Sequence, residues 1–69
     1  MNIFNCDLNK EYAVNRIMGN NARVHLEELG FTPGSIVTVI SRNSNLVIVK
    51  VRNVSFGIDV KLARKIILK

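Results

Sequence analysis

The alternation of hydrophobic and polar residues predicts short β-strands through the second half of the chain. Aliphatic and β-branched residues are dense over 36–41, 46–51, 54–60 and 65–68, and polar residues separate these stretches. The pattern is clearest over 46–51, where every second residue is valine. Each stretch is short enough for a strand and lacks the spacing of an amphipathic helix.

A weaker strand pattern lies near the N-terminus. Residues 3–6 fit a short first strand, 7–10 a polar turn, and 12–18 a second strand. Val14 and Ile17 are three positions apart, which interrupts the strict alternation of a strand. We therefore expect a β-bulge in this second strand.

Residues 22–29 form the one convincing helical pattern. The apolar stripe of this helix has members at positions i, i+4 and i+7, namely Ala22, Leu26 and Leu29. A side chain from Asn20 or Asn21 is expected to cap the first turn by accepting from a free backbone N–H. Because two turns of helix are unstable alone in water, the helix is expected to pack on the sheet.

Glycine, proline and asparagine mark the turns. Gly30 directly follows the helix, where a left-handed residue is favoured, and Phe31 follows as the apolar clamp of a Schellman-type end. Pro33 and Gly34 fit the two central positions of a tight turn. Asn53 tolerates the positive φ that a two-residue hairpin turn at 52–53 requires. Gly30, Gly34 and Asn53 are therefore predicted to have structural roles.

These elements predict a mostly β fold: a small barrel of five or six strands with one short α-helix. Residues 42–45 form a polar hairpin loop, and 61–64 a single helical turn before the closing strand. A closed or nearly closed barrel hides the edges of the sheet, which suits many short strands in so small a chain. We expect residues 1–69 to form one domain, since no repeat or linker interrupts them.

Charge is distributed unevenly along the chain. The net charge is +5, with −1 over residues 1–34 and +6 over residues 35–69. Such a basic half suits nucleic acid, an anionic membrane surface or an acidic protein partner, and it can also serve solubility alone.

Hydrophobic stretches, the N-terminal sequence and the cysteine count indicate the cellular compartment of the protein. No stretch approaches the ~18 consecutive apolar residues of a membrane span, and the N-terminus lacks the pattern of a signal peptide. Cys6 is the only cysteine, so no internal disulfide can form. The sequence therefore predicts a cytoplasmic location.

The sequence does not predict an enzyme. His25 is the only histidine, and nothing nominates a third group to orient it with a nucleophile such as Cys6. No phosphate-binding glycine motif is present, and we expect no cofactor. His25 and Glu28, at i and i+3 of the helix, are weak candidates for metal ligands, but their spacing matches no metal motif, so no metal site is predicted.

The segment Leu-Glu-Glu-Leu-Gly-Phe-Thr-Pro-Gly-Ser-Ile-Val-Thr-Val-Ile, residues 26–40, resembles the signature of the FeoA family. There a helix ending in Leu-Gly-Phe runs through Pro-Gly into a strand rich in valine and isoleucine. The resemblance extends over nearly the whole chain. It implies an SH3-like barrel and a cytosolic accessory role in bacterial ferrous iron uptake, acting on the membrane transporter FeoB, whose cytosolic part carries a GTPase domain.

The chain departs from the family pattern at several positions. Glu11 and Asn53 stand where glycine is usual, and His25 where arginine is common before the helix leucine. The loop over 42–45 is shorter than the usual one, which often contains Gly-Asp-Pro.

The resemblance favours an interaction module that binds a protein partner. Arg23, Glu27, Phe31 and Pro33 are the predicted partner contacts, because exposed residues on and after the helix have no role in the core. Phe31 has an alternative role as the helix-end clamp. The basic second half is expected to allow peripheral contact with an anionic membrane surface.

Two other classes remain open at this point. A nucleic-acid-binding barrel of the KOW type would use the basic half, but only one of the four aromatic residues, Phe56, lies there, so we expect a protein partner rather than nucleic acid. A metal sensor or chaperone would have to use His25.

Overall fold

The computed structural model describes residues 1–69 and contains five strands and two helices. The strands are β1 (Glu11–Ile17), β2 (Ile36–Arg42), β3 (Leu46–Val51), β4 (Val54–Asp59) and β5 (Ile66–Leu68), and the helices are α1 (Asn20–Glu28) and α2 (Val60–Ala63). The mostly β fold predicted from the sequence is confirmed. Helix α2 is the predicted single helical turn, and it begins one residue earlier than expected.

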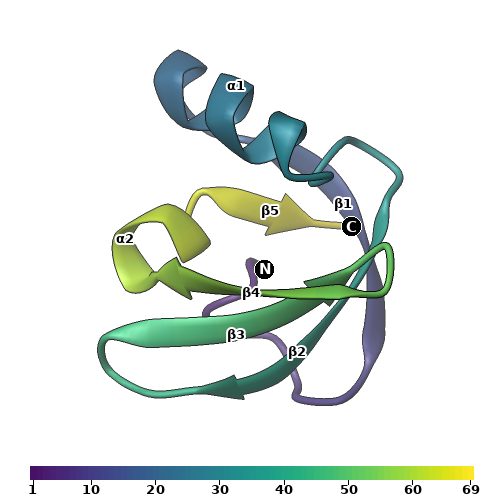
Figure 1. The fold of residues 1–69 in the computed structure, drawn as a ribbon, viewed down its shortest axis with the longest axis vertical. Coiled ribbons are helices and arrows are strands. Elements are labelled where there is room, and N and C mark those ends of the chain that lie inside the picture. Colours follow the sequence, from purple (N-terminus) through teal and green to yellow (C-terminus); the bar gives the residue numbers. More distant parts are fainter.

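All five strands belong to one antiparallel sheet in the order β4-β3-β2-β1-β5. The sheet curls so that β5 lies between α1 and the β3–β4 hairpin, and α2 connects β4 to β5 at one side (Figure 1). The register of β1 shifts between Val14 and Arg16, which is the predicted bulge. A second bulge, between Val39 and Ser41 of β2, was not predicted.

The core consists of 17 buried hydrophobic residues, and no polar or charged residue is buried with them. Alternate residues of β2 and β3 supply much of it, because Val37, Val39, Val47, Val49 and Val51 all point inward. At about 25 cal/mol per Å² of apolar surface, such burial is the main source of stability in a chain this small. The core is filled by apolar side chains, and the one charged side chain that reaches in beside it is the half-buried Arg42, whose Nη1 is buried.

The predicted first strand at residues 3–6 is wrong. This segment is a turn, in which the Asn2 side-chain oxygen accepts hydrogen bonds from the N–H groups of Phe4 and Asn5. Asn2 forms only an isolated bridge with Ile67 of β5. The turn serves to place Ile3 in the core, where it is fully buried. Asparagine readily forms such local side-chain bonds, and they compete with strand pairing.

Helix α1 starts two residues earlier than predicted, and it is not capped as expected. Gly19 is the N-cap residue, and no side chain accepts a hydrogen bond there. Asn20 and Asn21 lie within the first turn of the helix, so neither acts as the cap. The predicted stripe does pack inward, with Ala22 and Leu26 buried and Leu29 packed against the core.

The C-terminal end of α1 has the predicted Schellman geometry. The Phe31 N–H donates to the Leu26 carbonyl at 3.1 Å, and the Gly30 N–H donates to the Glu27 carbonyl at 3.0 Å. Gly30 has φ 111°, a conformation that L side chains rarely adopt. Leu26 and Phe31 are both fully buried, so the end of the helix is fastened to the core.

Candidate functional site

The turn after α1 links the helix to the sheet. The Ser35 N–H donates to the Thr32 carbonyl at 2.9 Å, and Gly34 has φ 89°, as a type II turn requires. The Gly34 N–H also donates to the Val14 carbonyl of β1 at 2.7 Å. Pro33 is exposed at the corner of this turn. The predicted turn is therefore confirmed, and it presents Pro33 on the surface beside the helix.

Three of the four predicted contact residues reach the surface. Arg23 and Pro33 are exposed and Glu27 is half-buried, and together they form what we term the helix surface. The prediction that Phe31 is an exposed contact is wrong. Its side chain is 0% exposed, and its ring lies 6.0 Å from that of Phe56, centroid to centroid, in a tilted arrangement. Phe31 is the helix-end clamp, and it offers no surface to a partner.

The weak metal candidates do not form a site with other ligands. His25 and Glu28 are both exposed on α1. No group of three histidine, cysteine, aspartate or glutamate side chains gathers where a metal ion could be held. Protein metal sites are usually built from at least three such ligands.

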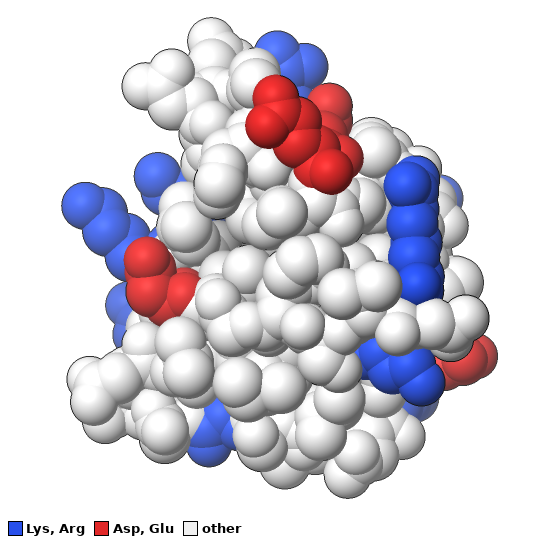
Figure 2. Space-filling view, viewed as in Figure 1, with Lys and Arg blue, Asp and Glu red and all other residues white.

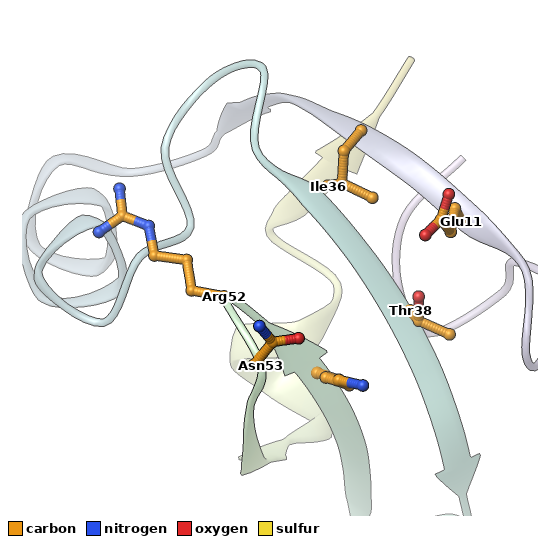
Figure 3. A pocket seen from close by; sticks show the side chains of 6 residues that line it. Glu11, Ile36, Thr38, Arg52 and Asn53 are labelled. Carbon is orange, nitrogen blue, oxygen red and sulfur yellow. The ribbon is translucent and has the colours of Figure 1, made fainter.

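The molecule has one hollow on its surface, and it lies on the outer face of the sheet. Its volume is about 230 Å³, and one of its six lining residues is hydrophobic. The residues come from three neighbouring strands and the β3–β4 turn: Glu11, Ile36, Thr38, Lys50, Arg52 and Asn53. Figure 3 shows Ile36, Thr38 and Glu11 on one side of the hollow and the turn residues Arg52 and Asn53 on the other.

The register of the sheet fixes the order of the charged groups across the hollow. Glu11 of β1 lies opposite Thr38 of β2, and Thr38 lies opposite Lys50 of β3. With strands about 4.8 Å apart, Glu11 and Lys50 are separated by two strand spacings, or roughly 10 Å. They therefore face the hollow from opposite sides.

Arg52 connects the hollow to the end of α1. A Cβ atom placed on Gly30 would lie 3.3 Å from Cδ and 3.5 Å from Nε of Arg52, so the arginine stem covers this glycine. Figure 3 shows the Arg52 side chain extending from the β3–β4 turn toward the helix. Arg52 and Asn53 have φ 53° and 64°, which confirms the predicted two-residue turn. The hollow therefore adjoins the C-terminal end of α1 at Gly30.

The sequence did not single out the hollow as a site. Alternation indicates which side chains of a strand share a face, but it does not show which residues of separate strands lie side by side. The Glu11–Thr38–Lys50 row depends on how β1 pairs with β2, and these strands are separated by α1 and its turn.

Acidic side chains gather on α1 and also occur beside basic ones elsewhere on the surface. Figure 2 shows a group of acidic side chains over the end of the molecule that α1 occupies, further acidic side chains close to basic ones at the two sides, and a largely uncharged face between them. Glu27 and Glu28 are the acidic residues of the helix.

None of the four aromatic residues is exposed. Tyr12 and Phe31 are buried, and Phe4 and Phe56 are half-buried. The guanidinium carbon of Arg64 lies 4.7 Å from the centroid of the Phe4 ring, which further covers that ring. The surface therefore lacks the exposed rings on which single-stranded nucleic acids stack.

The single cysteine lies inside the molecule. Cys6 is 1% exposed, and burial raises the pKa of its thiol, while the positive charge of Arg42 partly opposes this rise. Arg42 points inward because the bulge in β2 places it opposite Val47, which is buried. A buried thiol with a raised pKa is a poor nucleophile.

Comparisons with known proteins agree on one family. The model of the FeoA domain matches residues 1–69, the full length of the chain. None of the curated proteins matches the sequence. No helix of the structure has the length and apolar character needed to cross a membrane.

Three solved structures share this fold. A crystal structure of an iron uptake regulatory protein, FeoA, is 28% identical with a TM-score of 0.90, and the match covers 100% of this chain and 95% of that one. The zinc complex of Stenotrophomonas maltophilia FeoA, described as an SH3 domain protein, is 20% identical with a TM-score of 0.87 and coverage of 100% and 89%. Iron(II) transport protein A from Clostridium thermocellum is 15% identical with a TM-score of 0.88 and coverage of 100% and 44%. The SH3-like fold expected from the sequence is confirmed.

Proposed function

This chain belongs to the FeoA domain family, and on that premise we propose that it is a non-enzymatic accessory module of ferrous iron uptake that docks on the cytosolic part of the FeoB transporter. The family match over all 69 residues is the observation that carries the proposal. The FeoA structure with 28% identity is described as an iron uptake regulatory protein, which supports the same role.

The positions of the polar and charged side chains support docking on another protein. The core holds no polar or charged residue, and the one hollow is an open feature of the sheet surface. The groups able to recognise another molecule are therefore exposed on the outside. A protein with this arrangement is better suited to contact with another protein's surface than to enclosing a small substrate.

The helix surface is the contact that we propose for the transporter. Arg23 and Glu27 are at i and i+4 of α1, so they lie on the same side of the helix. Pro33 stands on the rigid turn that follows. The Schellman end of α1 holds helix and turn in a fixed relation, which lowers the entropy lost on docking.

A capture experiment tests this proposal. The immobilised chain is exposed to the purified cytosolic region of FeoB, and the retained fraction is compared for the parent protein and for Arg23→Glu and Glu27→Lys. We expect each substitution to weaken capture about tenfold, because it places like charge against the partner.

Arg16→Glu is the matched control for Arg23→Glu, since Arg16 is also exposed but lies on β1. This variant has the same change in net charge and is expected to bind like the parent. Equal weakening by Arg16→Glu would mean that only overall charge matters, and no capture of the parent at low salt would contradict the proposal.

We also propose that the domain works in the cytoplasm, next to the inner membrane surface. Lys61, Arg64 and Lys69 are exposed near the C-terminal end of the chain. Each such cation near an anionic leaflet contributes about 1 kcal/mol to attraction. Sedimentation with vesicles containing phosphatidylserine, compared with neutral phosphatidylcholine vesicles, tests this contact. Equal sedimentation with both would contradict it.

A further inference from the structure

We propose that the hollow on the outer face of the sheet binds an extended acidic segment of a protein partner. Carboxylates of this segment contact Lys50 and Arg52, and an apolar neighbour rests on Ile36. The inference rests on the proposed function only in taking the ligand to be a protein. It assigns a second surface, separate from Arg23 and Glu27, and a defined chemistry for its ligand.

The shape of the hollow suits an extended chain. It follows β2 between β1 and β3, with Thr38 and Ile36 on the same outward-facing side of β2. Residues two apart in a strand are about 6.7 Å apart, and an extended ligand has the same repeat. Lys50 is an outward-facing residue of β3 and Arg52 stands in the turn directly after this strand, so both basic groups line the same end of the hollow.

The donors of the hollow are free to bind a ligand. None of the side-chain hydrogen bonds in the structure involves Lys50, Arg52 or Asn53. Glu11 is the one acceptor with a negative charge, and it is about two strand spacings from Lys50. A carboxylate can therefore bind the basic side without first breaking an internal ion pair. Hydrogen bonds between charged groups are the stronger kind.

The basic side of the hollow is held in place before a ligand arrives. Arg52 and Asn53 form the tight turn between β3 and β4, and the Arg52 stem packs over Gly30. Ile36, at the start of β2, is 51% exposed, a large fraction for an isoleucine in a strand. An apolar side chain of the ligand would cover it. The fixed turn and the exposed isoleucine together favour specific binding of the peptide over non-specific electrostatic attraction.

Glu11 distinguishes an acidic peptide from nucleic acid. A nucleic acid strand has a phosphate at every nucleotide, so one of them would lie near Glu11 and be repelled. An acidic segment with alternating apolar residues can place carboxylates on the Lys50 side alone. The absence of an exposed aromatic ring points the same way.

Nuclear magnetic resonance titration of the whole chain tests the inference. The probe is a short capped peptide of alternating aspartate and leucine, and the comparison peptide replaces aspartate by asparagine. We expect the first peptide to shift the backbone amide signals of Thr38, Lys50 and Asn53, and the second to leave them unchanged. Shifts confined to α1, or equal shifts with both peptides, would overturn the proposal.

Single substitutions give the second part of the test. Lys50→Gln and Arg52→Gln should each weaken peptide binding about fivefold, in line with the loss of one partly exposed charge contact. Glu11→Gln should strengthen it about threefold, because a like charge is removed. Lys61→Gln, an exposed lysine on α2, is the control with the same charge change as Lys50→Gln, and it should have no effect.

Other occupants would give different results. Tighter binding of a single-stranded thymidine oligonucleotide than of the acidic peptide would overturn the proposal, as would concentration-dependent dimers that Lys50→Gln disrupts. Peptide binding without capture of FeoB would uphold this inference and contradict the proposed function, and the reverse pattern would do the opposite.

Discussion

Three glycines of this fold differ in their backbone conformation and in the space around them. Gly30 has φ 111° and lies under the Arg52 side chain, whereas Gly34 has φ 89° with open space around the position of a Cβ. Gly57 needs no positive φ, and a Cβ there would be in ordinary contact with Leu46 and Ile48. The three glycines therefore distinguish two effects of a side chain: the strain of a positive φ, and the contact of a Cβ with neighbouring atoms.

Alanine substitution of these three glycines is expected to give three distinct outcomes. Gly34→Ala should destabilise by about 1–2 kcal/mol through backbone strain alone. Gly30→Ala should cost more, because Arg52 must also move. Gly57→Ala should be neutral or stabilising by up to about 1 kcal/mol, since glycine within a strand is entropically unfavourable. Urea unfolding of the three variants measures these differences. Equal losses at Gly30 and Gly34 would show that the contact with Arg52 is unimportant.

Cys6 links stability to alkaline pH. Burial raises the pKa of its thiol in the folded state above the ordinary value of about 8.5. Above that ordinary pKa the unfolded chain loses the proton while the folded chain keeps it, so stability falls as pH rises. Below it both states are protonated, and the thiol adds no pH dependence.

We therefore expect a smaller alkaline loss of stability in Cys6→Ala. The free energy of unfolding is measured for both proteins at about pH 8 and about pH 10, on either side of the ordinary thiol pKa. Every other residue is the same in both proteins, so the difference between the two losses isolates Cys6. An identical loss in both proteins would contradict the assignment.

At the scale of elements, the two helices begin in different ways. Helix α2 is capped by Asp59, whose Oδ1 accepts from the Leu62 N–H at 2.8 Å. Helix α1 begins at Gly19 with no side-chain cap. Helix α2 thus depends on the side chain of its N-cap residue, whereas α1 depends on the packing of its C-terminal end against the core.

Removal of the α2 cap should lower the stability of the protein, whereas substitution in the first turn of α1 should not. Asp59→Ala should destabilise by about 1 kcal/mol, whereas Asp59→Asn keeps an acceptor oxygen and should cost little. Asn20→Ala and Asn21→Ala should be neutral or slightly stabilising, because alanine has the higher helix propensity. Thermal unfolding followed by circular dichroism checks the series. A loss of about 1 kcal/mol at Asn20 or Asn21 would mean that α1 does have a side-chain cap.

At the scale of the whole molecule, Phe31 joins the helix to the barrel. It is fully buried, it follows the Schellman end of α1, and its ring meets that of Phe56 from β4. A chain of this length has a stability of about 4–10 kcal/mol. Loss of a large aromatic side chain from such a core removes a substantial part of it.

Phe31→Ala should therefore destabilise by about 3–5 kcal/mol and leave little of the protein folded at elevated temperature. Phe31→Leu keeps most of the apolar volume and should remain folded at room temperature. If Phe31→Leu then captures FeoB like the parent, the residue has no direct role in docking. Urea unfolding measures the stability of both variants, and a loss below about 1 kcal/mol for Phe31→Ala would contradict its place in the core.

The sequence was most informative where a local conformation follows from the residues themselves. The turns at Gly30, Gly34 and Asn53 and the strand from Leu46 to Val51 were predicted, because turn chemistry and alternation act over a few neighbouring residues. The family resemblance of residues 26–40 rests on the same local features.

Long-range packing decided the rest. It buried Ile3 and Phe31, and it set the pairing of β1 with β2 that brings Glu11, Thr38 and Lys50 into one row. Alternation is compatible with more than one register, and the register is selected only when the barrel closes and the core is filled. The strands and turns were thus determined by the sequence locally, whereas the hollow exists only in the folded sheet.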